Sequence, residues 1–535
     1  MQPISSPYRA FCDSAAHAAH RTFVAAPASA RLPWAPDGFS ISYGRAAEQV
    51  EMLSRHYAMR GYGHGSRIAL LLQNRPDFLI HWLALNALGA SIVPLNGDLR
   101  PEELHHQLVI SQADALIVAD ELTGLAAAGA PEGLMVAMLG MPPPPARVPR
   151  TPAESRPADE AALLFTSGST GKPKACILSN YYFMNVAQWY VSMRGVAAMT
   201  PFAETSLTPL PFFHMNALGC TAVGMMLIGG AIVPLDRFHP SRWWQTIRDS
   251  GATIVHSLGV IPAILLQQPR TEAERTHGAR FTFGPGVRAN HKAAFEARFA
   301  LPIVEGWAMT ETGGAAVTDT AGETRTLGPN CIGRPRPGME WRIIDDTGTP
   351  LPPGMAGELL VRAAGNDPRS GFFSGYLNEP EATEEAWSGG WFHTGDIVSA
   401  DRDGLLYFVD RKKSVIRRSG ENISALEVEV VLAADPQVRA VAVTPVPDAV
   451  REEEVFAFIV PAGQADATAL LERAAERLSY HKLPAFVMYV DALPVSSTEK
   501  LRRGQIRADA EAAVAAGRAL ELGTLKHALR KARTL

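Results

Sequence analysis

Apolar residues along the chain recur in blocks whose spacing fits first a helix and then a strand. Residues 78–87 form an apolar helical stretch that is followed by Gly89 and by the apolar segment 91–95. Residues 217–227 are followed in the same way by a glycine pair and the segment 231–235. A helix, a glycine stop and a buried strand form the half-unit of an α/β sheet, so we predict a doubly wound α/β fold. The two similar blocks indicate either related subdomains or a coincidence, because glycine commonly follows a helix.

The uncharged stretch 217–235 approaches the length of a membrane-spanning helix. Gly229, Gly230 and Pro234 interrupt it, and such residues end helices and border short strands. We therefore expect a buried helix followed by a core strand here, and no membrane span.

Composition narrows the class of protein further. Of the 535 residues, 47% are hydrophobic and 19% are charged, so the chain can bury large cores in more than one domain. Lys plus Arg (50) nearly balances Asp plus Glu (54), which leaves no overall field for a nucleic acid or an anionic membrane. The four cysteines lack the spacing of a disulfide framework or a zinc site, so we expect a reducing, cytoplasmic setting.

The prolines at 142–145 and the stretch 149–158 indicate a surface connection, and the apolar segment 161–165 directly after it predicts a short strand. Further along, residues 341–345 and 357–362 predict strands joined by Pro/Gly turns. This part of the chain is therefore expected to form a smaller β-rich subdomain.

The pattern changes after Asp410. Residues 440–443 and 455–460 predict short strands, and the Ala-, Glu- and Leu-rich segment 508–526 predicts a surface helix. We place a domain boundary near residue 410. The two expected domains are residues 1–410 and 411–535.

A glycine-rich loop from Thr166 to Lys174 follows the predicted strand 161–165. Its glycines allow a turn that exposes successive backbone N–H groups, and its hydroxyls and lysines complete a cradle for phosphate oxygens. It is not a Walker A loop, because Thr166 replaces the first glycine and Pro173 stands where Ser or Thr would bind magnesium. A flexible Ser/Gly linker is the alternative, but a linker seldom follows an apolar strand or carries two lysines.

Five motifs in the expected order resemble those of the adenylate-forming superfamily, which includes acyl-CoA synthetases, firefly luciferase and peptide adenylation domains. They are Thr166 to Lys174, Gly306-Trp307-Ala308-Met309-Thr310-Glu311, Trp391-Phe392-His393-Thr394-Gly395-Asp396, Asp410-Arg411-Lys412-Lys413 through Gly420-Glu421-Asn422, and Pro494 to Lys500. The resemblance implies a large N-terminal domain of two doubly wound α/β subdomains plus a β-rich subdomain, followed by a small mobile α+β C-terminal domain.

The resemblance also implies a reaction in two halves. A carboxylate attacks the α-phosphate of ATP to give an acyl-adenylate and pyrophosphate, and the thiol of coenzyme A then displaces AMP. Charge on the transferring phosphoryl oxygens must be neutralised, so ATP, Mg²⁺ and coenzyme A are the expected cofactors. The loop residues that would hold the β- and γ-phosphates are Thr166, Ser167, Gly168, Ser169, Thr170, Gly171, Lys172 and Lys174.

By the same resemblance, Thr310 contacts the α-phosphate and Glu311 binds magnesium, a hard ion that prefers carboxylate oxygen. Trp307 occupies the position of a Tyr that stacks on adenine, and indole preserves the flat aromatic surface. A core Trp is the alternative, since large aromatic residues are usually buried for packing. Asp396 would accept hydrogen bonds from both ribose hydroxyls, unless it only caps a turn.

Three more positions complete the expected nucleotide site. Gly284, Pro285 and Gly286 would allow the backbone to approach adenine and the acyl chain closely, although glycine turns are common. Arg411 resembles the family's ribose-contacting arginine, and a plain surface cation is the alternative.

The catalytic cation implied by the resemblance is Lys500, whose long stem would carry its charge to the α-phosphate and the carboxylate. Glu499 stands where the family usually has glycine and could partly offset that charge. Lys413 occupies the hinge position, where the C-terminal domain would rotate between the two half-reactions. Gly420 would then approach the pantetheine channel, and Ala175 replaces a common glycine at the exit of the phosphate loop.

His214 lies in a segment, Pro211 to Asn216, that resembles the motif bordering the acid pocket and its aromatic or His gate. No Asp lies between Glu204 and Asp236, which argues against an α-amino acid substrate. Several apolar residues indicate an adaptable pocket, although they fit a plain core equally well. These residues are Phe212, Met215, Met225, Met226 and Trp307.

Residues 243–268 and 281–287 loosely resemble carnitine/crotonobetaine-type CoA ligases, which does not identify the acid. We predict an ATP-dependent carboxylate–CoA ligase that has no nucleic acid partner. A homodimer is one assembly that such an enzyme could form. The alternatives are an enzyme that loads a carrier protein and a silent paralogue that only binds nucleotide. Glu499 and Ala175 would fit a silent paralogue, whereas the intact catalytic residues argue against it.

Overall fold

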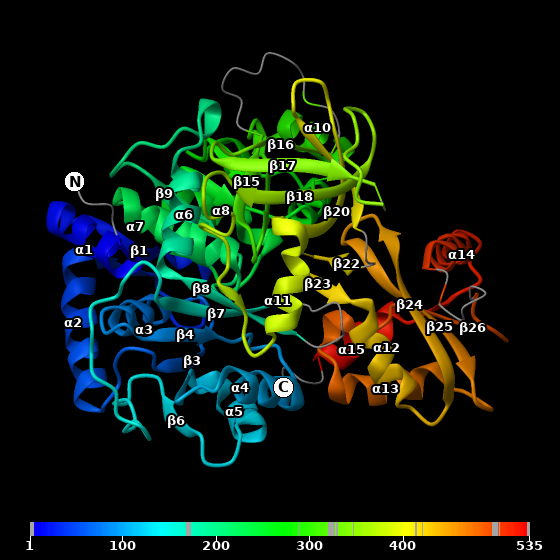
Figure 1. Cartoon of the computed structure of the whole chain (residues 1–535), viewed down its shortest axis with the longest axis horizontal. Coiled ribbons are helices and arrows are strands. Elements are labelled where there is room, and N and C mark those ends of the chain that lie inside the picture. Colours follow the sequence, from blue (N-terminus) through cyan, green and yellow to red (C-terminus); the bar gives the residue numbers. More distant parts are fainter. Residues whose placement is uncertain are drawn as a thin grey trace. The chain divides into compact units, whose positions relative to one another are not determined.

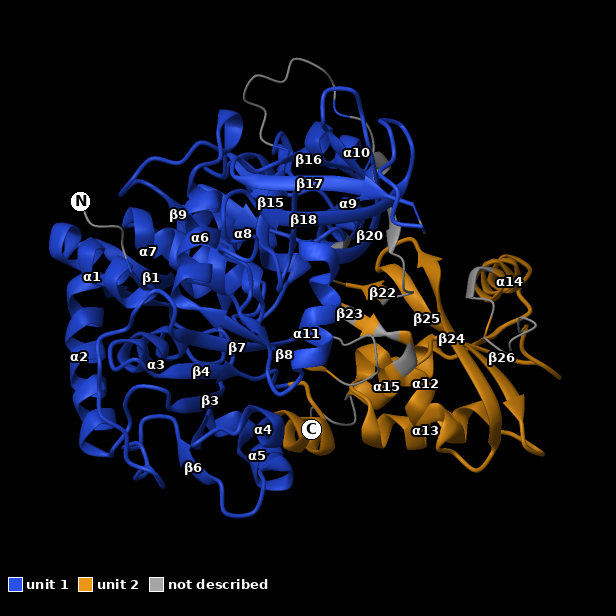
Figure 2. Ribbon diagram, viewed as in Figure 1, with its two compact units in different colours: residues 1–97, 108–165, 175–410 blue, residues 98–107, 166–174, 411–535 orange. Residues whose placement is uncertain are grey.

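The computed structural model describes residues 5–166, 173–287, 289–318, 327, 330–345, 347–411, 415–419, 421–494, 501 and 503–531. The chain divides into two compact units (Figure 2). Unit 1 comprises residues 1–97, 108–165 and 175–410, and unit 2 comprises residues 98–107, 166–174 and 411–535. Each unit contains its own sheet structure and hydrophobic core.

The first sheet of unit 1 has the strand order β19-β8-β7-β4-β3-β5-β6. Its strands are β3 (Arg67–Leu71), β4 (Ser91–Pro94), β5 (Ala115–Val118), β6 (Met135–Met138), β7 (Glu160–Thr166), β8 (Lys174–Ser179) and β19 (Gly375–Tyr376). The helices in this part of the chain are α2 (Tyr43–Met59), α3 (Pro76–Asn86), α4 (Pro101–Ser111) and α5 (Thr123–Gly129). The predicted helix at 78–87, its glycine stop and the strand after it are confirmed as α3, Gly89 with φ +72°, and β4.

The second sheet of unit 1 has the order β13-β12-β11-β9-β10-β1-β2, and all its pairs are parallel except β1 with β2. Its strands are β1 (Thr22–Ala26), β2 (Phe39–Ser42), β9 (Thr205–Thr208), β10 (Ala231–Pro234), β11 (Ile254–His256), β12 (Phe281–Phe283) and β13 (Ile303–Val304). The helices here are α1 (Pro7–Ala18), α6 (Asn180–Val191), α7 (Gly224–Ile228), α8 (Trp243–Ser250), α9 (Val260–Gln267) and α10 (Ala289–Phe299). Two sheets with parallel pairing and intervening helices confirm the predicted doubly wound α/β fold (Figure 1).

The uncharged run 217–235 folds as a π-helix η4 (Asn216–Val223), then α7 and β10. Gly229 takes φ +65° between α7 and β10, a left-handed conformation that favours glycine. The expected buried helix and core strand are therefore confirmed, with a π-helical first half. None of the helices in the described ranges has both the length and the apolar content that crossing a bilayer requires.

The third sheet of unit 1 has the order β14-β15-β16-β21-β20-β18-β17, and its recorded pairs are antiparallel. Its strands are β14 (Gly306–Met309), β15 (Gly313–Val317), β16 (Cys331–Pro335), β17 (Met339–Ile344), β18 (Gly357–Ala363), β20 (Phe392–Ala400) and β21 (Leu406–Arg411), and α11 (Pro380–Ala386) precedes β20. The expected β-rich subdomain is confirmed, since the strands predicted at 341–345 and 357–362 are the neighbours β17 and β18.

One hydrophobic core runs through all three sheets of unit 1. The end of α6 is packed into it, where the Trp189 ring lies over β15. A Cβ built on Gly314 would come within 1.9 Å of Trp189 Cε3, and one on Gly306 within 2.8 Å of Phe283 Cζ. Glycines at these points therefore let aromatic rings lie directly on the backbone of the strands that carry the candidate site.

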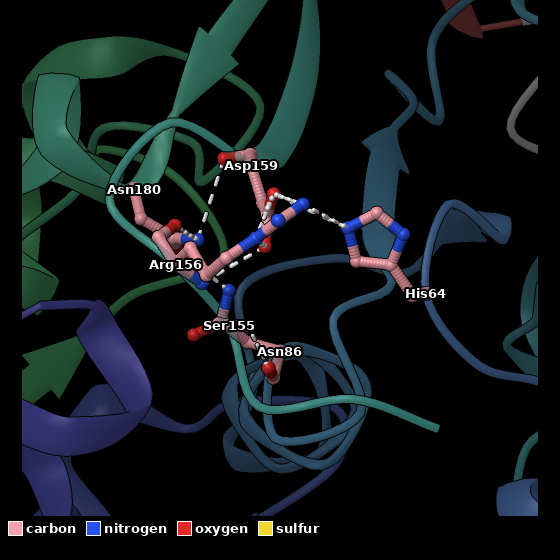
Figure 3. A network of polar contacts seen from close by, with 6 residues as sticks. All are labelled: His64, Asn86, Ser155, Arg156, Asp159 and Asn180. Carbon is pink, nitrogen blue, oxygen red and sulfur yellow. Dashed lines mark hydrogen bonds and ion pairs between the residues drawn. The ribbon is translucent and has the colours of Figure 1, made fainter. Parts of the chain in front are cut away.

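The connection before β7 is tied down by polar groups (Figure 3). Asn86 Nδ2 donates to Asn180 Oδ1 at 2.8 Å, and Asn180 Nδ2 donates to the carbonyl of Arg156 at 2.9 Å. Asp159 pairs with Arg156 at 2.9 Å and with His64 at 3.2 Å. These contacts anchor the end of the expected surface connection. They therefore also position β7, the strand that leads into the glycine-rich loop.

Unit 2 is built on a sheet with the order β23-β22-β25-β26-β27, in which β24 also pairs with β25. Its strands are β22 (Val415–Arg418), β23 (Glu421–Ser424), β24 (Val438–Asp448), β25 (Glu452–Pro461), β26 (Phe486–Tyr489) and β27 (Leu520–Glu521), and its helices include α12 (Ala425–Ala433), α13 (Ala467–Arg477), α14 (Arg503–Ala515) and α15 (Gly523–Lys531). The strands predicted at 440–443 and 455–460 are confirmed as parts of β24 and β25.

The single surface helix predicted at 508–526 is wrong. Helix α14 ends at Ala515, Gly517 follows with φ +64°, and β27 pairs with β26 before α15 begins. The glycine favours the left-handed turn that ends the helix, and the residues after it pair with β26 as a strand. One face of α14 is also buried, through Ile506, Ala510 and Ala513. Composition alone favoured one helix because Ala, Glu and Leu are strong helix formers on both sides of the break.

Candidate active site

The parallel strands of the second sheet have their carboxyl ends on the same side of the sheet. Strands β9, β10, β11 and β12 run in the same direction, so their carboxyl ends lie together. His214 lies in the segment after β9, His256 ends β11, and Gly284 follows β12. Since ligands of doubly wound sheets bind outside the carboxyl ends of the strands, this edge is the candidate substrate side.

Two predicted nucleotide residues from separate motifs meet in the third sheet. The Trp307 Nε1–H group on β14 donates a hydrogen bond to Asp396 Oδ2 on β20, at 2.9 Å. The Asp396 side chain is fully buried and Trp307 is 5% exposed. A buried carboxylate requires donors, and the indole supplies one here. The fold therefore brings together the residues expected at adenine and at the ribose, although 89 positions separate them.

Glu311, the expected magnesium ligand, is held by Tyr376 on β19. The Tyr376 hydroxyl donates to Glu311 Oε1 at 2.9 Å, and the backbone N–H of Phe373 donates to the Glu311 carbonyl at 2.8 Å. Burial, and then the adjacent Glu311 carboxylate, raise the pKa of Tyr376 well above its usual value, so the phenol keeps its proton and acts as the donor. Thr310 lies next to Glu311, half-buried in the turn between β14 and β15.

At Gly284 the close approach that the sequence predicts is made by the chain itself. A Cβ at this position would lie 1.9 Å from the carbonyl oxygen of Ser257, so a side chain cannot be accommodated. Gly286 has φ +77°, which also favours glycine, and Pro285 lies between the two. The glycines thus allow the segment after β12 to lie against the end of β11.

The described ends of the phosphate loop are two strands. Thr166 is the last residue of β7, and the buried Lys174 is the first residue of β8. Ala175 is also buried, and its carbonyl accepts from the Leu377 N–H at 2.8 Å, so the departure from glycine is accommodated within β8. Ser167, Gly168, Ser169, Thr170, Gly171 and Lys172 lie outside the described residues.

Further predicted residues also lie outside the described ranges. They are Lys500 and its neighbour Glu499, Lys413 at the expected hinge, and Gly420. Arg411 is the last residue of β21, and only its backbone is described. The roles expected of these residues therefore remain predictions.

His214, the expected gate, is half-buried just before the π-helix. Its N–H donates to the Pro211 carbonyl at 3.0 Å, and its ring packs edge-on against Phe213 with centroids 4.7 Å apart. Met225 and Met226 are fully buried, which favours the core interpretation for these two residues. Phe212 and Met215 are buried in the same hydrophobic core.

Sequence reasoning missed several polar residues at the site. Tyr376 lies 65 positions from Glu311, and no local pattern marks it as a partner of that residue. At the edge of the second sheet, Tyr190, His256 and Asn216 form a hydrogen-bonded chain. His256 ends an apolar strand and could have been found as a polar residue at a strand's carboxyl end, whereas its partners follow only from the tertiary structure.

The motifs agree with what comparison with known families finds. The family described as AMP-binding enzyme matches residues 13–377, and the AMP-binding enzyme C-terminal domain matches residues 427–500. The crotonobetaine/carnitine–CoA ligase of Salmonella typhi is 31% identical over 444 residues, which cover 78% of this chain and 83% of that protein.

Solved structures with the same fold include two enzymes at 26% identity. An amide bond synthetase from Marinactinospora thermotolerans aligns with a TM-score of 0.79, covering 94% of this chain and 99% of the other. A malonyl-CoA ligase with methylmalonyl-CoA and AMP bound aligns with a TM-score of 0.73, covering 89% of this chain and 96% of the other.

Proposed function

Because this chain belongs to the AMP-binding enzyme family, it is an acid–thiol ligase of the AMP-forming class, and we propose roles for its residues in that reaction. The enzyme joins a carboxylic acid to coenzyme A at the expense of ATP, through an acyl-AMP, with release of pyrophosphate. The observation that best supports the residue roles is the hydrogen bond between Trp307 and Asp396, which unites two nucleotide motifs.

In the proposed nucleotide site, Asp396 binds the ribose hydroxyls and Trp307 contacts the adenine. The indole N–H of Trp307 orients the buried Asp396 carboxylate, so this side chain is already in position before ATP binds. Preorganised groups of this kind lose little freedom when the ligand binds. Thr166, Lys174 and the loop between them are proposed to hold the β- and γ-phosphates, and Thr310 the α-phosphate.

The donor set at Glu311 fits a magnesium ion, because a carboxylate is a ligand that this hard cation prefers. When bound, the ion would neutralise charge on the phosphate oxygens. Tyr376 fixes the orientation of Glu311 through the 2.9 Å hydrogen bond. Glu311→Gln should lower AMP release and raise the magnesium concentration needed for half-maximal rate, and Tyr376→Phe should show the same shift more weakly.

The control for this test is Tyr181→Phe, since Tyr181 is 47% exposed. Magnesium titrations of AMP release compare the variants. A magnesium requirement that is unchanged in Glu311→Gln would remove this residue from the metal site.

We further propose that the C-terminal domain alternates between two positions during the reaction. Lys500 supplies the cation at the α-phosphate in the first half-reaction, Lys413 serves as the hinge, and Gly420 borders the pantetheine channel in the second. These roles come from the family motifs in the sequence. Arg411 is proposed to contact the ribose.

The acceptor deserves a direct test, because one solved relative is an amide bond synthetase. With a carboxylic acid panel, ATP and Mg²⁺, we expect free coenzyme A to give a thioester together with AMP and pyrophosphate. A phosphopantetheinylated carrier protein and a simple amine serve as competing acceptors. ADP and phosphate as products would contradict the acyl-AMP mechanism. A preference for the carrier protein or the amine would show that coenzyme A is not the acceptor.

A cytoplasmic location is proposed because all four cysteines are free thiols and three of them are buried in unit 1, as suits a reducing compartment. A homodimer is proposed through β6, which ends the first sheet in the described part of the chain. Met135, Val136 and Met138 on this strand are exposed, and residues 133–146 carry no charge that would oppose pairing with a second copy.

Light scattering tests the dimer. Val136→Lys should shift the protein to a monomer, because a charge on an edge strand opposes pairing. Val148→Lys, at an exposed position outside β6, is the control. A monomeric parent protein at micromolar concentration would contradict the dimer.

A further inference from the structure

Three side chains from different elements form a hydrogen-bonded chain at the carboxyl edge of the second sheet. The Tyr190 hydroxyl on α6 lies 2.7 Å from His256 Nε2 on β11, and His256 Nδ1 lies 2.7 Å from Asn216 Oδ1. Tyr190 and His256 are fully buried, whereas Asn216 is partly exposed. The hydrogen-bonded chain therefore leads from the interior to Asn216, the one of these three side chains that is partly exposed.

The direction of each hydrogen bond follows from the chemistry of the groups. Burial lowers the pKa of His256 to about 3, so the ring is neutral and carries a single N–H. Since Asn216 Oδ1 can only accept, that proton is on Nδ1, and Nε2 accepts from the Tyr190 hydroxyl. The amide oxygen of Asn216 thus accepts from His256. The Nδ2 group of Asn216, with two N–H donors, takes no part in the hydrogen bonds among these three side chains.

Asn216 lies on the side of the second sheet where we expect the acid to bind. It is the first residue of the π-helix, a form of helix that recurs at functional sites, and it follows the expected gate, His214, by two residues. The His256 ring packs against Phe283 with centroids 5.4 Å apart, and the Ser257 N–H donates to the Phe283 carbonyl at 2.9 Å.

The segments at the carboxyl ends of β9, β11 and β12 carry no carboxylate. Residues 209–216, 256–260 and 283–287 contain no Asp or Glu. The acid that follows β10, Asp236, is already paired with His239 at 2.8 Å. A cationic acyl chain would lack a free carboxylate partner from these segments, whereas an oxygen atom would meet a donor.

We propose that Asn216 is a specificity-determining residue whose Nδ2 amide binds an oxygen atom of an uncharged oxo, hydroxy or ether substituent on the acyl chain, with His256 and Tyr190 as positioning residues. The inference rests on the proposed ligase function and names the class of acid. A site built to hydrogen-bond a substrate oxygen discriminates strongly against the analogue that lacks it, because its own polar groups are then left unpaired.

Matched pairs of acids test Asn216. The probes are pentanoate with 4-oxopentanoate, hexanoate with 5-oxohexanoate, and heptanoate with 6-oxoheptanoate, and the measurement is kcat/KM for AMP release with coenzyme A. The parent enzyme should prefer at least one oxo acid over its partner by about tenfold or more. Asn216→Leu, of similar size, should abolish this preference by lowering kcat/KM for the oxo acid toward the value for its unsubstituted partner. Equal ratios in parent and variant would overturn the proposal.

The positioning residues are tested by the same ratio, which a merely structural role would not change. His256→Phe and Tyr190→Phe should both reduce the ratio of kcat/KM for the oxo acid to kcat/KM for the unsubstituted acid. Tyr181→Phe, on the same helix but exposed, is the control. If His256→Phe does not fold, Tyr190→Phe carries the test, and a retained preference in that variant would contradict its role.

Charge is tested with 4-(trimethylammonio)butanoate and its neutral isostere 5,5-dimethylhexanoate. We expect the neutral acid to be used better, and a preference for the cationic acid would overturn the uncharged class. The ligase function itself is judged separately, since it fails only if no acid in the whole panel releases AMP.

Discussion

At the scale of single residues, the two acids of the candidate nucleotide site share one structural device. Asp396 and Glu311 are both buried, and an aromatic side chain holds one oxygen of each: Trp307 donates to Asp396, and Tyr376 donates to Glu311. A hydrogen bond to a charged group is stronger than one between neutral groups, so each carboxylate is held in one orientation. Both acids are therefore oriented by aromatic donors that lie on other strands.

Trp307→Phe tests this device at the ribose. The change keeps an aromatic surface but removes the donor to Asp396, which we expect to raise the KM for ATP about 10- to 100-fold, since a hydrogen bond to a charged group contributes about 1.5–3 kcal/mol. Steady-state kinetics of AMP release measure the effect. Trp391→Phe is the control, because the Trp391 ring instead packs under Arg342 and Arg362. An unchanged KM for ATP would separate Trp307 from the nucleotide site.

At the scale of elements, the packing of α6 on the third sheet positions the turn that carries Thr310 and Glu311. Trp189 near the end of α6 lies on β15, where Gly314 leaves no room for a side chain. The turn between β14 and β15 therefore depends on a helix more than a hundred residues earlier in the chain. Close packing of this kind tolerates added atoms poorly.

Gly314→Ala should destabilise the protein, because its Cβ would lie 1.9 Å from Trp189 Cε3. Overpacking of a well-packed core costs about 1–3 kcal/mol or more, which should lower the Tm by several degrees. Gly124→Ala is the matched control, since a Cβ there meets nothing within 4 Å and alanine favours the helix α5. Equal melting temperatures for Gly314→Ala and the parent would contradict the packing argument.

At the scale of the whole molecule, the proposed alternation predicts that the two half-reactions separate. Lys500→Ala should abolish acyl-adenylate formation, because one well-placed cation contributes about 3–4 kcal/mol, or several hundredfold in rate. The same variant should still convert a supplied acyl-adenylate and coenzyme A into thioester. Lys413→Pro, which stiffens the expected hinge, should impair the second half-reaction more. Equal slowing of both halves by Lys500→Ala would refute domain alternation.

Acid sensitivity of the fold is a second property of the whole molecule. Burial lowers the pKa of His81 to about 4 and that of His256 to about 3, from an ordinary value of 6.5. Below pH 6.5 the unfolded chain therefore binds protons that the folded chain excludes, so stability falls as the pH is lowered toward 4. Each ring should contribute about 1.4 kcal/mol per pH unit in this range.

Melting curves between pH 7 and pH 4 measure this dependence. His81→Gln should retain a partner for the Tyr57 hydroxyl and flatten the fall in Tm, because the group that titrates is gone. His20→Gln, at an exposed position, should not flatten it. A slope unaffected by His81→Gln would contradict the assignment.

Local sequence determined much of this protein. The apolar block before Gly89 and the strand after it predict α3 and β4, because a helix stop needs only one left-handed residue and a buried strand only a short apolar run. The motifs identified the family for the same reason, since they are contiguous. The helix expected at 508–526 failed because strand pairing, a contact distant in sequence, overrode helix propensity after Gly517.

Only the tertiary structure decided which side chains meet. The contacts of Trp307 with Asp396 and of Glu311 with Tyr376 join strands that are far apart in the chain. Asn216 and His256 are brought together by the parallel alignment of β9 and β11, which no spacing in the sequence encodes. Hydrogen bonds act over about 3 Å, whereas sequence patterns report only neighbours within a few turns of chain, so the partners of the buried acids and of His256 follow from the fold alone.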